Sequence, residues 1–100
     1  MFMEDVEAGP TNRRHRKVLK ERFIREGLDG LVDSEVIELL LFYSMPKQDT
    51  RPVARTLLES FGDLQGVVEA PFGELVALPG MDVHSSILIK AAWDFPKRAR

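Results

Sequence analysis

The chain has 100 residues, 44% of them hydrophobic and 30% charged, and a formal net charge of −2, all typical of one small globular domain. It contains no cysteine, which excludes disulfides and thiolate metal sites and fits a reducing cytoplasm, where we expect the protein to reside. The longest apolar run, Leu39–Tyr43, is far too short to span a bilayer, and the acidic N-terminal residues lack the order of a signal peptide. With only two histidines, well separated in the chain, we expect neither a metal site nor a cofactor.

The first third of the chain concentrates positive charge. We expect a disordered N-terminal arm over residues 1–12, which include Gly9-Pro10, and one domain over residues 13–100. The first helix is predicted from about Asn12 to Glu26, with Leu19 and Phe23 facing the core. The spacing i, i+3, i+4, i+7 places four cations on another face: Arg13, Arg16, Lys17 and Lys20. These four are candidate contacts to DNA phosphates, and a solvated helix face without a ligand is the alternative.

The second helix is predicted to be central and buried. Asp33 is its candidate N-cap, apolar residues cover nearly every side, and Pro46 should end it. Glu35 and Glu38 share one face, but no nucleophile, base or metal ligand accompanies them in the sequence. We therefore interpret both as charges that complement the helix dipole and face solvent.

Three short helices should follow, bounded by caps, prolines and glycines: from Asp49 or Thr50 to Gly62, from Asp63 to Glu69, and from Pro71 to Leu78. No segment of the chain alternates polar and apolar residues convincingly with period two. The sequence therefore predicts an all-α fold, a compact bundle of five to six helices.

Residues 75–84 predict a helix, a Pro79-Gly80 turn and the start of a last helix that runs to Phe95, before Pro96. This C-terminal unit is helix-hairpin-helix-like, and such units hold a nucleic-acid phosphate with backbone N–H groups at the second helix's N-terminus. Gly80 is expected to have a positive φ. Gly80 and His84 are accordingly candidate DNA contacts, while a simple turn between two helices is the alternative.

Asp82 weakens the expected phosphate grip of this hairpin. Hairpin units of this kind usually carry Gly-x-Gly in the turn, and Asp82 stands at the second glycine. An aspartate there is a good N-cap for the last helix, because its carboxylate accepts hydrogen bonds from first-turn amides. The same carboxylate then occupies the anion position and repels phosphate, by about 1 kcal/mol at 4 Å in water.

The order of these segments resembles the N-terminal helical domain of the RadC family, the DNA repair protein RadC-like proteins of UPF0758 type. The resemblance covers roughly residues 13–95 and is carried by the following segments: His15-Arg16 through Arg22-Phe23, Glu26-Gly27-Leu28, Asp33 to Tyr43, Pro46-Lys47, Asp49-Thr50, Pro52, Ala54, Leu57-Leu58, Phe61-Gly62 and Leu78-Pro79-Gly80. Departures from the family pattern are Asp82 in the turn and Ser86, where a small apolar residue is usual.

The resemblance implies a bacterial, cytoplasmic protein in which this domain precedes a JAB/MPN-type, metalloprotease-like domain. That second domain is absent from the chain, so no enzyme activity is expected of the residues present. The leading hypothesis is a non-catalytic DNA-binding module that contacts the phosphate backbone without sequence specificity. The alternative is a protein-interaction or regulatory domain that docks on the JAB/MPN-type domain or on a client protein. No membrane partner is expected.

Overall fold

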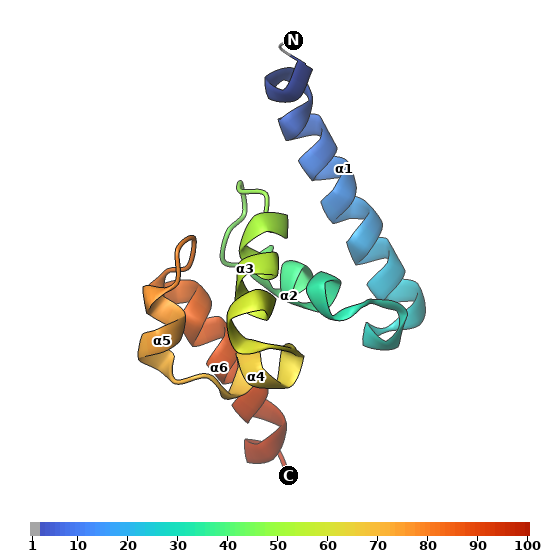
Figure 1. Cartoon of the computed structure of the whole chain (residues 1–100). Coiled ribbons are helices and arrows are strands. Elements are labelled where there is room, and N and C mark those ends of the chain that lie inside the picture. Colours follow the sequence, from blue (N-terminus) through green and yellow to red (C-terminus); the bar gives the residue numbers. More distant parts are fainter. Residues whose placement is uncertain (1–2) are drawn as a thin grey trace.

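The computed structural model describes the backbone of residues 3–100 and the side chains of residues 11–100. Every regular element in that part of the chain is helical, which confirms the predicted all-α class (Figure 1). In chain order the elements are α1 (Met3–Glu26), the 3₁₀ helix η1 (Leu28–Gly30), α2 (Asp33–Leu41), α3 (Arg51–Phe61), α4 (Leu64–Glu69), α5 (Phe72–Ala77) and α6 (Val83–Arg98). None of these helices combines the length and the apolar character needed to cross a bilayer.

Helix α2 lies between two apolar clusters, which confirms the prediction that it is central. One side of α2 supplies Ile37 and Leu41 to the larger cluster, which also contains buried residues of the other C-terminal elements: Met45, Val53, Ala54, Leu57, Val67, Ala70, Leu75 and Ile89. Its other side supplies Leu39 to a smaller cluster with Leu19, Leu31 and Phe42. Leu19 thereby fixes α1 to α2, while the N-terminal part of α1 extends away from the remaining helices (Figure 1).

Two helices extend through prolines that the sequence analysis took as boundaries. Helix α1 begins at Met3, so the predicted start of the first helix at about Asn12 is wrong, while the expectation of a disordered arm stays untested. Helix α6 does not end at Phe95 but continues past Pro96 to Arg98, with the Ala99 N–H donating to the Phe95 carbonyl at 3.0 Å. Proline removes one backbone N–H and its ring crowds the carbonyl four residues earlier, but its fixed φ is compatible with a helix, so a helix can contain it at a cost of about 3 kcal/mol.

The second helix begins with a different cap from the one predicted, whereas the N-cap of the third is Thr50, one of its two predicted caps, and the other candidate, Asp49, accepts the Arg51 N–H at 3.0 Å. Val32, not Asp33, is the N-cap residue of α2, and its N–H donates to the Glu35 carboxylate at 3.1 Å. Helix α2 ends at Leu41, ahead of the predicted stop at Pro46. Thr50 precedes α3 without capping it through its side chain; its buried hydroxyl donates to the Glu38 carbonyl at 3.4 Å.

The boundaries of the shorter helices lie close to the predicted ones. Helix α3 ends at Phe61, and Gly62, whose φ is 95°, is its C-cap. Asp63 then caps α4 by accepting the Gly66 N–H at 2.8 Å. Pro71 precedes α5, which ends just before Leu78. The chain is thus turned back on itself repeatedly, and α4, α5 and α6 are brought around the same core as α2.

Candidate nucleic-acid interface and apolar groove

The basic residues of α1 divide into two groups. Arg13, Lys17 and Lys20 are exposed, as predicted for cations that share an outward face. Among the described residues none of these three forms an ion pair. The Lys20 ammonium lies 5.5 Å from the centroid of the exposed Tyr43 ring, so this cation also borders apolar surface.

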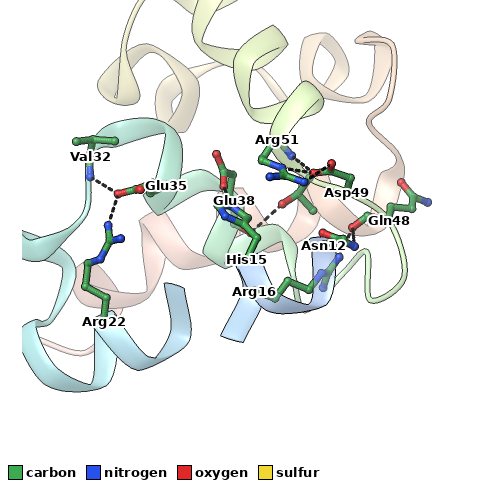
Figure 2. Close-up of polar contacts among 11 residues, drawn as sticks. Asn12, His15, Arg16, Arg22, Val32, Glu35, Glu38, Gln48, Asp49 and Arg51 are labelled. Atoms are coloured by element: carbon green, nitrogen blue, oxygen red, sulfur yellow. Dashed lines mark hydrogen bonds and ion pairs between the residues drawn. The ribbon is translucent and has the colours of Figure 1, made fainter. Parts of the chain in front are cut away.

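Arg16 does not belong to that exposed face, and its prediction as a phosphate contact is corrected. The residue is only 8% exposed, and its guanidinium donates to the carbonyl of Phe42 at 3.2 Å and to the carbonyl of Met45. It also donates to the carbonyl of Gln48, which lies beside it in Figure 2. It also lies over the Phe42 ring, 4.6 Å from the centroid. Burial lowers the pKa of Arg16, an effect partly opposed by the charge of Asp49. Arg16 therefore holds the 42–48 loop to α1 and is not free to reach a ligand.

The two carboxylates of α2, Glu35 and Glu38, bind groups within the chain instead of facing solvent. Glu38 is buried, contrary to the prediction of a solvent-facing charge, and its carboxylate lies 2.6 Å from Nε2 of His15 on α1 (Figure 2). Glu35 accepts from Arg22 at 3.0 Å as well as from the Val32 N–H. Both carboxylates thus join α1 to α2. In the described residues no group of three His, Cys, Asp or Glu side chains is arranged to hold a metal ion.

The C-terminal hairpin has the turn and the cap that the sequence predicts. Gly80 is exposed and has a φ of 89°, which confirms its predicted positive value. The Asp82 carboxylate accepts the Ser85 N–H at 2.7 Å, and this bond is the main reason that the pKa of Asp82 is lowered. Asp82 is therefore ionised at neutral pH and occupies the amide that a phosphate would use. His84 is exposed in the first turn of α6, close enough to Asp82 to lower its pKa further.

The buried hydroxyl of Ser86 is hydrogen-bonded within the hairpin. It is fully buried where a small apolar residue would be usual, and its hydroxyl donates to the Asp82 carbonyl at 2.8 Å. The neighbouring Ser85, also fully buried, contacts the hydroxyl of Ser44 at 2.8 Å. These bonds fasten the start of α6 to its own turn and to the loop after α2. The hairpin is thus stabilised from within the chain.

An apolar groove of about 750 Å³, which sequence reasoning did not predict, lies beside α2. It is bordered by α1 and η1 on one side and by α4 and α6 on the other, with α2 contributing its floor. Among the residues whose side chains the structure describes, Lys20 is the only charged one that lines it. Several large apolar side chains of this apolar groove remain accessible, namely Phe23, Ile24, Leu28, Tyr43 and the half-buried Trp93.

One sequence signal could have indicated the apolar groove. Ile24 follows Lys20 by four residues, so it continues the face that carries Arg13, Lys17 and Lys20. A large aliphatic residue at the end of a charged stripe is expected to face solvent unless something covers it, and Ile24 is indeed 81% exposed. Phe23 was predicted to face the core, but it is 42% exposed at the groove.

The chain is similar to curated proteins named UPF0758. It is 36% identical over 85 residues to a UPF0758 protein of Fusobacterium nucleatum, a match of 85% of this chain and 37% of that protein. It is 48% identical over 69 residues to a UPF0758 protein of Ruegeria pomeroyi, covering 69% of this chain and 31% of the relative. A UPF0758 protein of Rhodobacter capsulatus is 41% identical over 64 residues, which are 64% of this chain and 30% of the relative.

No protein-family model and no solved structure matches the chain. The relatives carry the family name expected from the RadC-like, UPF0758-type resemblance, although the assignment to an N-terminal domain stays a prediction. The chain spans about a third of the length of the curated relatives it matches. It is therefore a homologue of part of the UPF0758 proteins.

Proposed function

We propose that this domain is a non-catalytic DNA-binding module that contacts the phosphate backbone without sequence specificity. The observation that carries the proposal is the exposed cationic face of α1, where Arg13, Lys17 and Lys20 lie unpaired among the described residues. Along a helix these positions span about 10 Å, which matches the length of about three phosphates of one DNA strand. The cysteine-free composition supports a cytoplasmic location for this role.

The hairpin makes at most a small contribution to this proposed binding. Gly80 and His84 are exposed and could approach a phosphate, but the ionised Asp82 lies between them in the sequence and already accepts the Ser85 N–H. A like charge at this position opposes an incoming phosphate most strongly at low ionic strength. The proposed interface is therefore centred on α1, and its affinity is expected to be low and sensitive to salt.

The test is a titration of labelled duplex and single-stranded DNA at several salt concentrations. The variant carries Arg13→Gln, Lys17→Gln and Lys20→Gln. We expect it to weaken binding to all sequences alike and to reduce the slope of log affinity against log salt by up to about three units. A matched control removes three exposed cations elsewhere, Arg55, Arg98 and Arg100, and so changes the net charge equally. If both triple variants lose affinity to the same extent, α1 is not the interface.

A second arm of the titration tests the hairpin. Asp82→Gly removes the charge beside the turn and restores the Gly-x-Gly pattern, and glycine remains an acceptable N-cap at a cost of a few tenths of a kcal/mol. If the hairpin can hold a phosphate, this variant should bind DNA more tightly than the parent at low salt. Unchanged affinity would leave α1 as the sole proposed contact, and DNA binding by neither protein would refute the proposal.

The second candidate function is a protein-interaction domain, and the apolar groove is the observation that favours it. Exposed apolar patches of several hundred Å² on soluble domains commonly mark surfaces that other molecules cover. The resemblance suggests a JAB/MPN-type domain or a client protein as the partner. Failure of the DNA titration together with saturable binding of an amphipathic helical peptide would favour this candidate.

A further inference from the structure

We propose that the Tyr43 ring, beside Lys20, is a stacking site for an unpaired base, so that the domain binds single-stranded DNA in preference to duplex. The inference rests on the proposed DNA binding by α1 and adds to it the form of DNA that is bound. Three observations carry it: an accessible aromatic ring, a cation without an ion pair next to that ring, and unfilled space beside both.

Tyr43 brings an aromatic ring to the cationic face of α1. The sequence of α1 contains no phenylalanine, tyrosine or tryptophan between Arg13 and Lys20. Tyr43 follows the end of α2, and the packing of α2 against α1 places its ring beside Lys20. A single exposed tyrosine is ordinary on a protein surface, so the proximity of this ring to the cations is what distinguishes it.

Lys20 is suited to bind the phosphate of the nucleotide whose base stacks on Tyr43. Its ammonium lies 5.5 Å from the centroid of the Tyr43 ring and forms no ion pair among the described residues. One nucleotide can reach both groups, since its phosphate and its base are joined through a single sugar. Arg13 and Lys17 precede Lys20 by about two turns and one turn on the same face, so they can contact neighbouring phosphates.

The space beside the ring is not filled by the chain. Tyr43 and Lys20 both line the apolar groove, and Tyr43 is 68% exposed. The groove volume of about 750 Å³ lies within the range of about 300–1,000 Å³ that is common for sites of small ligands. A flat base can therefore lie against the ring while its phosphate stays outside with the cations of α1.

This arrangement favours single strands because stacking requires an accessible base face. In a duplex each base is already stacked and paired, and it must be unstacked before it can contact an aromatic side chain. The cations of α1 can contact the phosphates of either form, whereas Tyr43 adds affinity only for an unpaired base. Every base has a π-face, so the added affinity carries no sequence specificity, in agreement with the proposed function.

The experiment compares the affinity of the protein for an oligothymidylate and for a duplex of the same length. Tyr43→Leu keeps an apolar side chain but removes the ring. This variant should weaken binding of the oligothymidylate by about fivefold or more and change duplex binding by less than about twofold. The slope of log affinity against log salt should stay unchanged, because no phosphate contact is lost. Tyr43→Phe, which keeps a ring, should bind like the parent.

A spectroscopic measurement locates the contact. Tyr43 is the only tyrosine of the chain, so its ring resonances in an NMR spectrum are assigned without ambiguity. They should shift when the oligothymidylate is added and stay in place when the duplex is added. The matched control is Phe95→Leu, which removes another exposed aromatic ring, on α6, that does not line the groove. This control should bind both DNA forms like the parent, and circular dichroism should show all variants folded.

The outcomes separate the stacking site from the proposed phosphate interface. If Tyr43→Leu has no effect, weakens both DNA forms equally, or is matched by Phe95→Leu or Tyr43→Phe, the stacking site is refuted. Tyr43 resonances that do not respond to the oligothymidylate also refute it. In each of these cases the phosphate interface stands if the Arg13, Lys17 and Lys20 triple variant still loses affinity. A parent that binds neither DNA form refutes both proposals.

Discussion

Replacement of Arg16 offers the sharpest test of how α1 is attached to the rest of the molecule. Arg16→Met keeps an apolar stem of similar length over the Phe42 ring but removes the guanidinium that donates to three carbonyls of the 42–48 loop. Replacing a buried charge by an apolar residue can be neutral where its partners are replaced as well. Here the loop carbonyls remain, and they lose their donors.

The expected cost follows from those three bonds. A hydrogen bond to a charged group contributes about 1.5–3 kcal/mol, and carbonyls near the surface recover part of this from water. We therefore expect Arg16→Met to lower the free energy of unfolding by about 3–5 kcal/mol. With a urea m-value of about 1–1.5 kcal/mol/M for a chain of this size, the unfolding midpoint measured by circular dichroism should fall by about 2 M or more. Arg16→Lys should lie in between, because an ammonium keeps the charge but not the planar fork.

Lys17→Met is the matched control, since it removes the adjacent, exposed cation of the same helix. Its effect on the free energy of unfolding should stay within about 0.5 kcal/mol. If Arg16→Met destabilises the protein no more than Lys17→Met does, the loop is not held by Arg16 and the reasoning is refuted. Arg16 would then again be available as a ligand contact.

Two further predictions concern the hairpin. Gly80→Val should destabilise the fold by about 1–3 kcal/mol, because a φ of 89° is strained for any residue with a Cβ and that Cβ would lie 3.3 Å from a Val53 methyl group. Calorimetry should therefore show a lower melting temperature for this variant. The control Gly73→Val, whose added side chain would enter open space, should lower the melting temperature less. The pKa of Asp82 is lowered from its ordinary value of 3.8, so its contribution to stability is fully present above that value and is lost as pH falls through the lower, folded pKa. The stability difference between the parent and Asp82→Asn should therefore shrink between pH 6 and pH 2, and a constant difference would contradict this assignment.

Local rules predicted several turns and one of the aspartate caps. Asp82 caps α6 and Gly80 has the expected positive φ, because both features depend on a few adjacent residues, whereas the cap expected at Asp33 lies at Val32 instead. The same rules misplaced the helix ends near Pro10 and Pro96. A proline disfavours a helix by removing a hydrogen bond and crowding the preceding turn, but it does not forbid one, because its φ is compatible with the helix.

The roles of the polar side chains on α1 could not be predicted in the same way. Helical periodicity groups Arg16 with Lys17 but does not reveal that the 42–48 loop lies over only one of them. The contact between His15 and the buried Glu38 joins residues 23 positions apart and has no local signature. The apolar groove likewise depends on how α1 is placed against α2, α4 and α6, which is a property of packing and not of any one segment.

The attachment of α1 also has a consequence for the order in which the chain folds. The α3–α4 turn and the α5–α6 hairpin join neighbouring segments, so the loops that must close are short and the associated loss of chain entropy is small. The carbonyls that receive Arg16 belong to a loop whose shape is set only after α2 and α3 have met. We therefore expect α1 to form early as a helix but to gain its polar anchorage late, after the C-terminal helices have assembled. Contacts at Arg16 should then influence the rate of unfolding more than the rate of folding.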